Sequence, residues 1–162
     1  MRQHKGFSLI ELLIVVAIIM VITAIAVNSY LRSRIAANEA AAVSAIRTVN
    51  SAQVLYNSTY PTVGYAATLG NLGGSGGVCN PPGPAHACLI DDILATAPHK
   101  KNGYIFSLSN VTGTPNATYT VIGAPVAPDA TGTRYFCSYE DAVVRFSTTA
   151  LAACDNTVAP LQ

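Results

Sequence analysis

Residues 5–16 read KGFSLIELLIVV, an apolar run that carries one carboxylate, Glu11, close to its start. No other ionisable side chain occurs from Phe7 to Val27. A helix of about 20 apolar residues is long enough to cross the hydrocarbon core of a bilayer. The stretch therefore predicts a membrane-spanning helix, in which a charge is costly and needs a function.

The composition describes one small domain attached to this apolar run. The chain has 162 residues and a formal net charge of +1, with no basic stripe, so no specific nucleic-acid partner is predicted. The sequence contains no nucleophile paired with a base and no phosphate-binding loop, which predicts no enzyme and no cofactor. No metal site is predicted either, because the acidic residues lack the spacing of a calcium loop: Asp129, Glu140, Asp141 and Asp155.

All four cysteines follow the apolar run, as expected for a domain that reaches an oxidising compartment. Four cysteines allow three pairings. We favour Cys79 with Cys88 and Cys137 with Cys154, because each pair is local and encloses a segment with little core-forming material. A metal site is the alternative, but no CxxC pair occurs and His86 is the only nearby imidazole.

The opening segment has two simple interpretations. A basic start before an apolar run is typical of a secretory signal, and residues 24–26, AIA, supply a cleavage pattern. The charge inside the run, and a length beyond the roughly 7–15 residues of such signals, argue against it. A plain membrane anchor explains the length but leaves Glu11 as an unexplained cost.

Cleavage between Gly6 and Phe7 gives Glu11 a function. The new amino terminus would lie one helical turn from Glu11, where the helix dipole favours a carboxylate. The ammonium and the carboxylate could pair within one chain. In a bundle, Glu11 of one subunit could instead bind the Phe7 ammonium of the next and set the register of assembly, because an unmatched charge is costly at low dielectric.

Residues 5–11, KGFSLIE, with the apolar tail to Val27, resemble the leader and N-terminal helix of type IV prepilins. The resemblance implies that residues 1–6 are a leader removed after Gly6 by a prepilin peptidase, which then methylates the amine of Phe7. Many members of that family have a glycine and a proline in the middle of this helix, where this sequence has Met20 and Asn28.

The helical pattern continues beyond Val27 with apolar residues at three-, four- and seven-residue steps. We therefore predict one helix from Phe7 to about Asn57, which ends before Tyr60 and Pro61. Residues 7–30 form its membrane or filament-core half, and residues 31–58 its amphipathic half. The inward stripe comprises Leu31, Ile35, Ala42, Ile46, Val49 and Tyr56, whereas Arg32, Arg34, Glu39 and Arg47 lie mostly off it.

Residues 59–162 are expected to form a globular head. Residues 59–103 form a Gly- and Pro-rich loop, with a short helix in 89–97 that turns Leu89, Ile93 and Leu94 inward. An antiparallel sheet over residues 104–148 then packs on the second half of the helix, and a disulfide ties down the tail. Its expected strands are 104–109, 118–122, 134–139 and 143–148. The fold class is α+β, a long N-terminal α-helix with a C-terminal antiparallel β-sheet head, type IV pilin-like.

These features predict a structural subunit that polymerises through its N-terminal helices into a pilus-like helical homopolymer. Its expected partners are copies of itself, the prepilin peptidase, an inner-membrane pilus assembly platform and, before assembly, the membrane. It would reside in the inner membrane and then in an extracellular pilus or a periplasmic pseudopilus. A major pseudopilin of a type II secretion system is the close alternative, and a membrane-anchored or secreted binding protein is the alternative from another class.

Overall fold

The computed structural model describes residues 7–74, 79 and 81–161. The chain divides into two compact units, residues 1–34 and 35–162, called here the N-terminal and C-terminal units. Helix α1 (Leu9–Thr59) contributes to both. No glycine or proline occurs between Phe7 and Thr59, so nothing in this stretch interrupts the helix. The predicted long helix is confirmed, and it ends directly before Tyr60 and Pro61.

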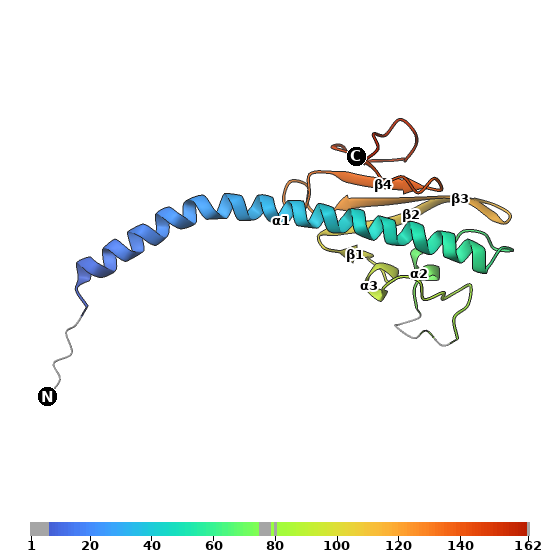
Figure 1. Ribbon diagram of the computed structural model, residues 1–162, viewed down its shortest axis with the longest axis horizontal. Coiled ribbons are helices and arrows are strands. Elements are labelled where there is room, and N and C mark those ends of the chain that lie inside the picture. The colour runs from blue at the N-terminus through green and yellow to red at the C-terminus, as the bar shows by residue number, and fades with distance from the viewer. Residues whose placement is uncertain (1–6, 75–78, 80, 162) are drawn as a thin grey trace. The chain divides into compact units, whose positions relative to one another are not determined.

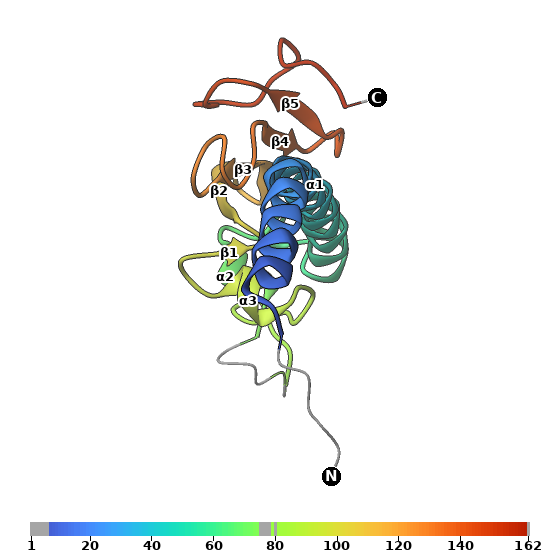
Figure 2. The same cartoon turned by 90° about the vertical axis from the view of Figure 1, so that its left-hand side faces the viewer.

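The C-terminal unit contains a five-stranded antiparallel meander with the strand order β1-β2-β3-β4-β5 (Figures 1 and 2). The predicted antiparallel sheet is therefore confirmed, although its strand bounds differ. Two short helices, α2 (Leu69–Leu72) and α3 (Asp92–Ala95), precede all five strands. The strands are β1 (Lys100–Lys101), β2 (Tyr104–Gly113), β3 (Asn116–Pro125), β4 (Tyr135–Tyr139) and β5 (Arg145–Ser147).

Strand β1 was not among the predicted strands. Its two lysines show no apolar alternation, but Asn102 and Gly103 follow them, and Asn-Gly is a strong hairpin signal. Both turn residues have positive φ, 48° and 76°, as a type I′ turn requires. The turn therefore pairs Lys100 and Lys101 with the start of β2.

The second half of α1 packs against the sheet (Figure 2). Its buried side chains recur at helical spacing, and buried residues of β2, β3 and β4 face them. Burying one large apolar side chain contributes about 1.5–3 kcal/mol, so this layer contributes substantially to the stability of the unit. The layer consists of Ala42, Ala45, Ile46, Val49 and Tyr56 from α1, and Tyr104, Phe106, Tyr119, Val121 and Phe136 from the sheet.

Three expectations about inward-facing residues were wrong. Leu31 belongs to the N-terminal unit and is exposed there. Helix α3 is only four residues long, so it buries Leu94 but leaves Ile93 62% exposed. Glu39, which was expected on the outer side of the helix, is 5% exposed.

Polar side chains of α1 attach specific loops to the helix. The Gln53 amide exchanges two hydrogen bonds with the backbone of Ala66, at 3.1 Å and 2.8 Å, as a neighbouring strand would. Asn50 donates to the Ser138 hydroxyl and accepts from the Tyr119 hydroxyl. Because each pairing satisfies buried polar atoms, it favours one register of the helix on the sheet.

Two disulfides close the loops of the unit, Cys79–Cys88 and Cys137–Cys154, which is the pairing favoured from the sequence. Cys137 is fully buried in β4 and holds the chain segment around Cys154 against the sheet. Beyond it, Ala159 and Leu161 exchange backbone hydrogen bonds with the segment Val144–Phe146. The tail thereby covers the outer edge of β5.

Glu39 joins α1 to the segment before β4. Its carboxylate accepts hydrogen bonds from the backbone and hydroxyl of Thr133, both at 2.9 Å, and from the backbone and guanidinium of Arg134. Burial raises the pKa of this carboxyl, but the bonds from Thr133 and Arg134 outweigh it and hold the pKa below its ordinary value. The ionised form therefore stabilises the fold.

We expect Glu39→Gln to lower the free energy of unfolding of the C-terminal unit by about 2–3 kcal/mol at pH 7. Hydrogen bonds to a charged group contribute about 1.5–3 kcal/mol. The ion pair with Arg134 adds less to the free energy of unfolding, because solvent screens the exposed guanidinium. Because the folded-state pKa of Glu39 is lowered, the stabilisation is complete above the unfolded pKa and is lost as pH falls through the folded value. Urea unfolding of the full chain in micelles, followed by near-ultraviolet circular dichroism, measures this difference. A difference between variant and wild type that does not shrink in acid would contradict the assignment.

Candidate functional site

The N-terminal half of α1 presents an apolar surface to its surroundings. In the described part of the chain, α1 is the one helix long and apolar enough to cross a membrane, and none of its most apolar window is buried within the chain. Phe7 and Leu9 are 82% and 80% exposed. A contiguous apolar surface of this size needs lipid or other protein to cover it.

Glu11 lies in the first turn of this helix. Its Oε2 accepts a hydrogen bond of 2.9 Å from the backbone N–H of Ser8, the residue before the helix begins. This contact is one arm of a capping box, in which a Glu three residues into the helix binds back to the capping residue. Ser8 and Glu11 have the spacing of that motif, a signal that the sequence analysis missed.

The bond from Ser8 orients the Glu11 carboxylate toward the start of the helix, where the dipole also favours negative charge. A carboxylate has two oxygens with about four acceptor positions, so one bond leaves room for an additional donor. Phe7, whose amine would become the chain terminus after cleavage, is adjacent to Ser8 in the sequence. Gly6 lies outside the described residues, so cleavage after it stays a prediction.

The polar residue Thr23 in the apolar half is satisfied by its own helix. Its hydroxyl donates to the backbone carbonyls of Ile19 and Met20, at 2.8 Å and 3.0 Å. Such back-bonding removes the cost of placing a hydroxyl in lipid. Helix α1 also continues through Met20 and Asn28, the positions where many type IV pilins carry the helix-loosening residues glycine and proline.

The acidic residues of the C-terminal unit serve separate purposes. Asp141 forms an ion pair with Arg145, at 2.7 Å, and Asp129 lies in the turn before β4. Glu140 and Asp155 line a groove. Within the described ranges, no three residues of the types His, Cys, Asp and Glu are grouped as metal ligands.

Comparison with known families identifies the opening segment. Residues 1–27 match a family model described as the prokaryotic N-terminal methylation motif. This motif is the prepilin-type signature of type IV pilins and pseudopilins, which are structural proteins and not an enzyme family. No match was found among curated proteins or solved structures.

We expect Gly6→Val to leave an uncut precursor in the membrane, because a peptidase that binds an extended chain has no space for a branched side chain directly before the scissile bond. Mass spectrometry of the intact chain would then show residues 1–6 retained and Phe7 unmethylated. His4→Val, two residues upstream in the leader, is the matched control and should be processed normally. A Phe7 terminus generated at the wild-type level in Gly6→Val would contradict cleavage at this bond.

Proposed function

We propose that this chain is a structural subunit of a type IV pilus-like filament. It is cleaved after Gly6, methylated on the amine of Phe7 and polymerised into a helical homopolymer through the apolar half of α1. The observation that carries the proposal is the methylation motif at residues 1–27, which continues into an exposed apolar helix with Glu11 in its first turn.

The exposed apolar surface has to be covered at every stage, first by membrane lipid and then by the helices of neighbouring subunits. Before assembly, residues 7–30 lie in the inner membrane, where lipid covers the side chains from Phe7 to Val27. Transferring this surface from lipid to water would cost about 25 cal/mol per Å² of apolar area. An inner-membrane assembly platform therefore has to transfer each helix directly into a bundle of like helices, which replaces lipid with protein.

Glu11 supplies the register that apolar packing lacks. Apolar helices can slide past one another at little cost, whereas a charge in a low-dielectric core is stable only beside its partner. The carboxylate, oriented by Ser8, would accept the Phe7 ammonium of a neighbouring subunit. One stagger satisfies both charges, and the other staggers leave both unmatched.

A filament outside the cell and a short periplasmic pseudopilus use the same subunit chemistry, so a major pseudopilin of a type II secretion system is the close alternative. A membrane-anchored or secreted binding protein would need neither methylation nor a carboxylate in the first turn. The methylation motif favours a filament subunit over that class.

We expect Glu11→Leu to insert into the membrane and to be processed at Phe7, because the cut precedes the substitution and a costly charge is removed. Filament yield should fall to a background level, since the incoming ammonium finds no carboxylate. Glu11→Gln should give an intermediate yield, because it retains hydrogen bonding without charge. Electron microscopy of cell surfaces and of sheared or periplasmic fractions measures assembly, and mass spectrometry of the same samples measures processing.

Ile14→Leu, an apolar exchange on an exposed residue of the same half of α1, is the matched control and should assemble normally. Normal filament yield from Glu11→Leu would show that the carboxylate serves only its own helix start through Ser8. Filaments that appear only in the periplasm would assign the chain to the pseudopilins.

A further inference from the structure

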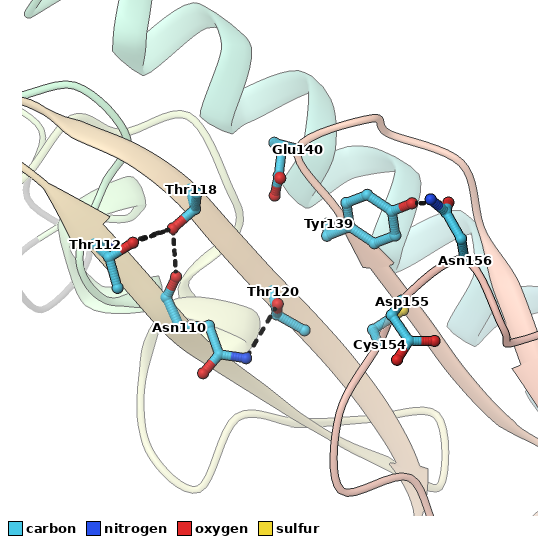
Figure 3. Close-up of a pocket in the computed structure, with 9 residues that line it drawn as sticks. All are labelled: Asn110, Thr112, Thr118, Thr120, Tyr139, Glu140, Cys154, Asp155 and Asn156. Atoms are coloured by element: carbon cyan, nitrogen blue, oxygen red, sulfur yellow. Dashed lines mark hydrogen bonds between the residues drawn. The ribbon is translucent and has the colours of Figure 1, made fainter.

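A groove lined mainly by polar residues opens on the C-terminal unit between the β2–β3 hairpin and the segments at Tyr139–Glu140 and Cys154–Asn156 (Figure 3). Its volume is about 440 Å³. Small-molecule sites typically enclose roughly 300–1,000 Å³, so the groove is large enough for a ligand of one to a few rings. All of its lining residues come from one copy of the chain, so the groove is complete before any assembly.

The lining chemistry selects a class of ligand. One wall carries the amide of Asn110 and threonine hydroxyls, and the other carries the Tyr139 ring and the carboxylates of Glu140 and Asp155. None of the residues that the structure places along the groove is a lysine or an arginine. Phosphate, sulfate and carboxylate ligands would therefore be repelled, and an apolar ligand would desolvate polar groups without replacing their hydrogen bonds.

An uncharged molecule with many hydroxyl groups fits these walls. Its hydroxyls can donate to the carboxylates of Glu140 and Asp155 and accept from the amide of Asn110, and hydrogen bonds to charged groups are the stronger kind. Asp155 holds its orientation because Oδ1 accepts from the backbone and hydroxyl of Thr157, which leaves Oδ2 for a ligand. The Tyr139 ring, which lines the groove, offers apolar surface to the C–H groups of a sugar ring.

The hairpin wall is held in place by its own hydrogen bonds. The Thr118 hydroxyl bonds to the Thr112 hydroxyl at 2.7 Å and donates to the backbone carbonyl of Asn110 at 2.8 Å (Figure 3). These contacts span the irregular pairing between Ser109 and Thr112, where Asn110 adopts a positive φ of 52°. Asn110 is therefore displaced from the regular ladder, and its side chain lines the groove.

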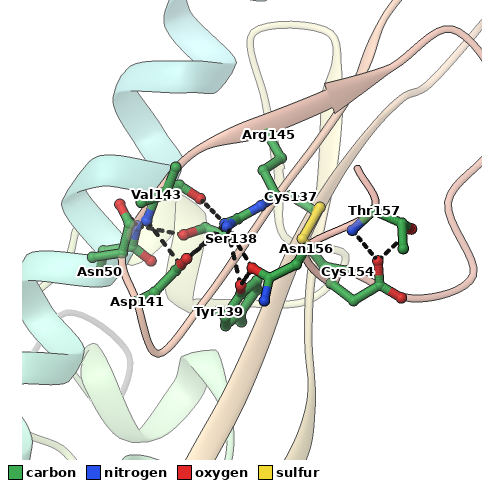
Figure 4. Close-up of polar contacts among 12 residues, drawn as sticks. Asn50, Cys137, Ser138, Tyr139, Asp141, Val143, Arg145, Cys154, Asn156 and Thr157 are labelled. Carbon is green, nitrogen blue, oxygen red and sulfur yellow. Dashed lines mark hydrogen bonds and ion pairs between the residues drawn. A yellow bond between two sulfur atoms is a disulfide. The ribbon is translucent and has the colours of Figure 1, made fainter. Parts of the chain in front are cut away.

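The opposite wall is held by a buried cation. The Arg145 guanidinium lies 4.5 Å from the centroid of the Tyr139 ring and donates to the Tyr139 hydroxyl at 3.0 Å and to Asn156 Oδ1 at 3.2 Å (Figure 4). Two further bonds, at 3.1 Å and 2.7 Å, bind it to the Asp141 carboxylate. Arg145 is 7% exposed, is not itself a lining residue of the groove, and has its charge paired with the Asp141 carboxylate.

The Cys137–Cys154 disulfide adds a covalent tie between β4 and the segment that carries Asp155 and Asn156 (Figure 4). Both walls are therefore ordered before a ligand arrives. A preformed site loses little conformational entropy on binding, so even a few hydrogen bonds can give measurable affinity.

From this arrangement we propose that the groove is a binding site for an uncharged saccharide. Glu140, Asp155 and Asn110 bind the sugar hydroxyls, and Arg145 is a positioning residue that fixes Tyr139 and Asn156. The site lies within one C-terminal unit, and its test does not depend on filament formation.

The test uses the full chain in micelles of a zwitterionic detergent that has no sugar headgroup. Isothermal titration calorimetry with galactose-terminated and N-acetylglucosamine-terminated uncharged trisaccharides should detect saturable binding of at least one. A sialylated trisaccharide and inorganic phosphate should bind more weakly or not at all. Glu140→Ala and Asn110→Gly should each weaken binding about tenfold, the loss of one charged or one amide hydrogen-bond partner.

Asn110→Gly removes the amide while glycine tolerates the positive φ, so the hairpin backbone is retained. Asp92→Asn, an exposed acidic position on α3 outside the groove, is the matched control and should bind like the wild type. Absence of binding for both uncharged trisaccharides would overturn the proposal. So would wild-type affinity in both groove variants, or a preference for the sialylated probe or phosphate.

Discussion

The exposed apolar half of α1 is the constraint on which the rest of the protein depends. A surface of leucine, isoleucine and valine cannot stay in water, so it must lie in lipid or against other helices. In either environment the Glu11 carboxylate is the one charged side chain from Phe7 to Val27, and a charge without a partner is costly at low dielectric. A bond from Ser8 already orients that carboxylate toward the helix start.

In the C-terminal unit, the second half of the same helix has to be held in one position on the sheet. Its sheet and the second half of α1 bury each other's apolar faces, but apolar contact alone specifies position weakly. Glu39, Asn50 and Gln53 supply the specificity, because each is satisfied only when one particular loop or strand lies opposite it. Buried polar pairs thus set the register of the helix on the sheet, as the Glu11 pair would set it between subunits.

Local signals made much of the fold predictable. Sustained helical periodicity without glycine or proline predicts α1, and Tyr60 with Pro61 predicts its end. The local spacing of the cysteines favoured the two disulfides that the structure contains. Two further signals were present in the sequence and went unused: the capping spacing of Ser8 and Glu11, and the Asn102–Gly103 turn that creates β1.

The sequence by itself determined the apolar helix, the charge within it, the α+β class and the N-terminal motif, because each depends on residues close together in the chain. Only the tertiary structure decided that Glu39 is buried and bonded, because its partners Thr133 and Arg134 are more than 90 residues away in the sequence. The groove likewise brings Asn110 opposite Glu140 and Asp155. Spacing along the chain carries no information about such pairs, since they meet only when the sheet folds and the Cys137–Cys154 bond returns the tail to it.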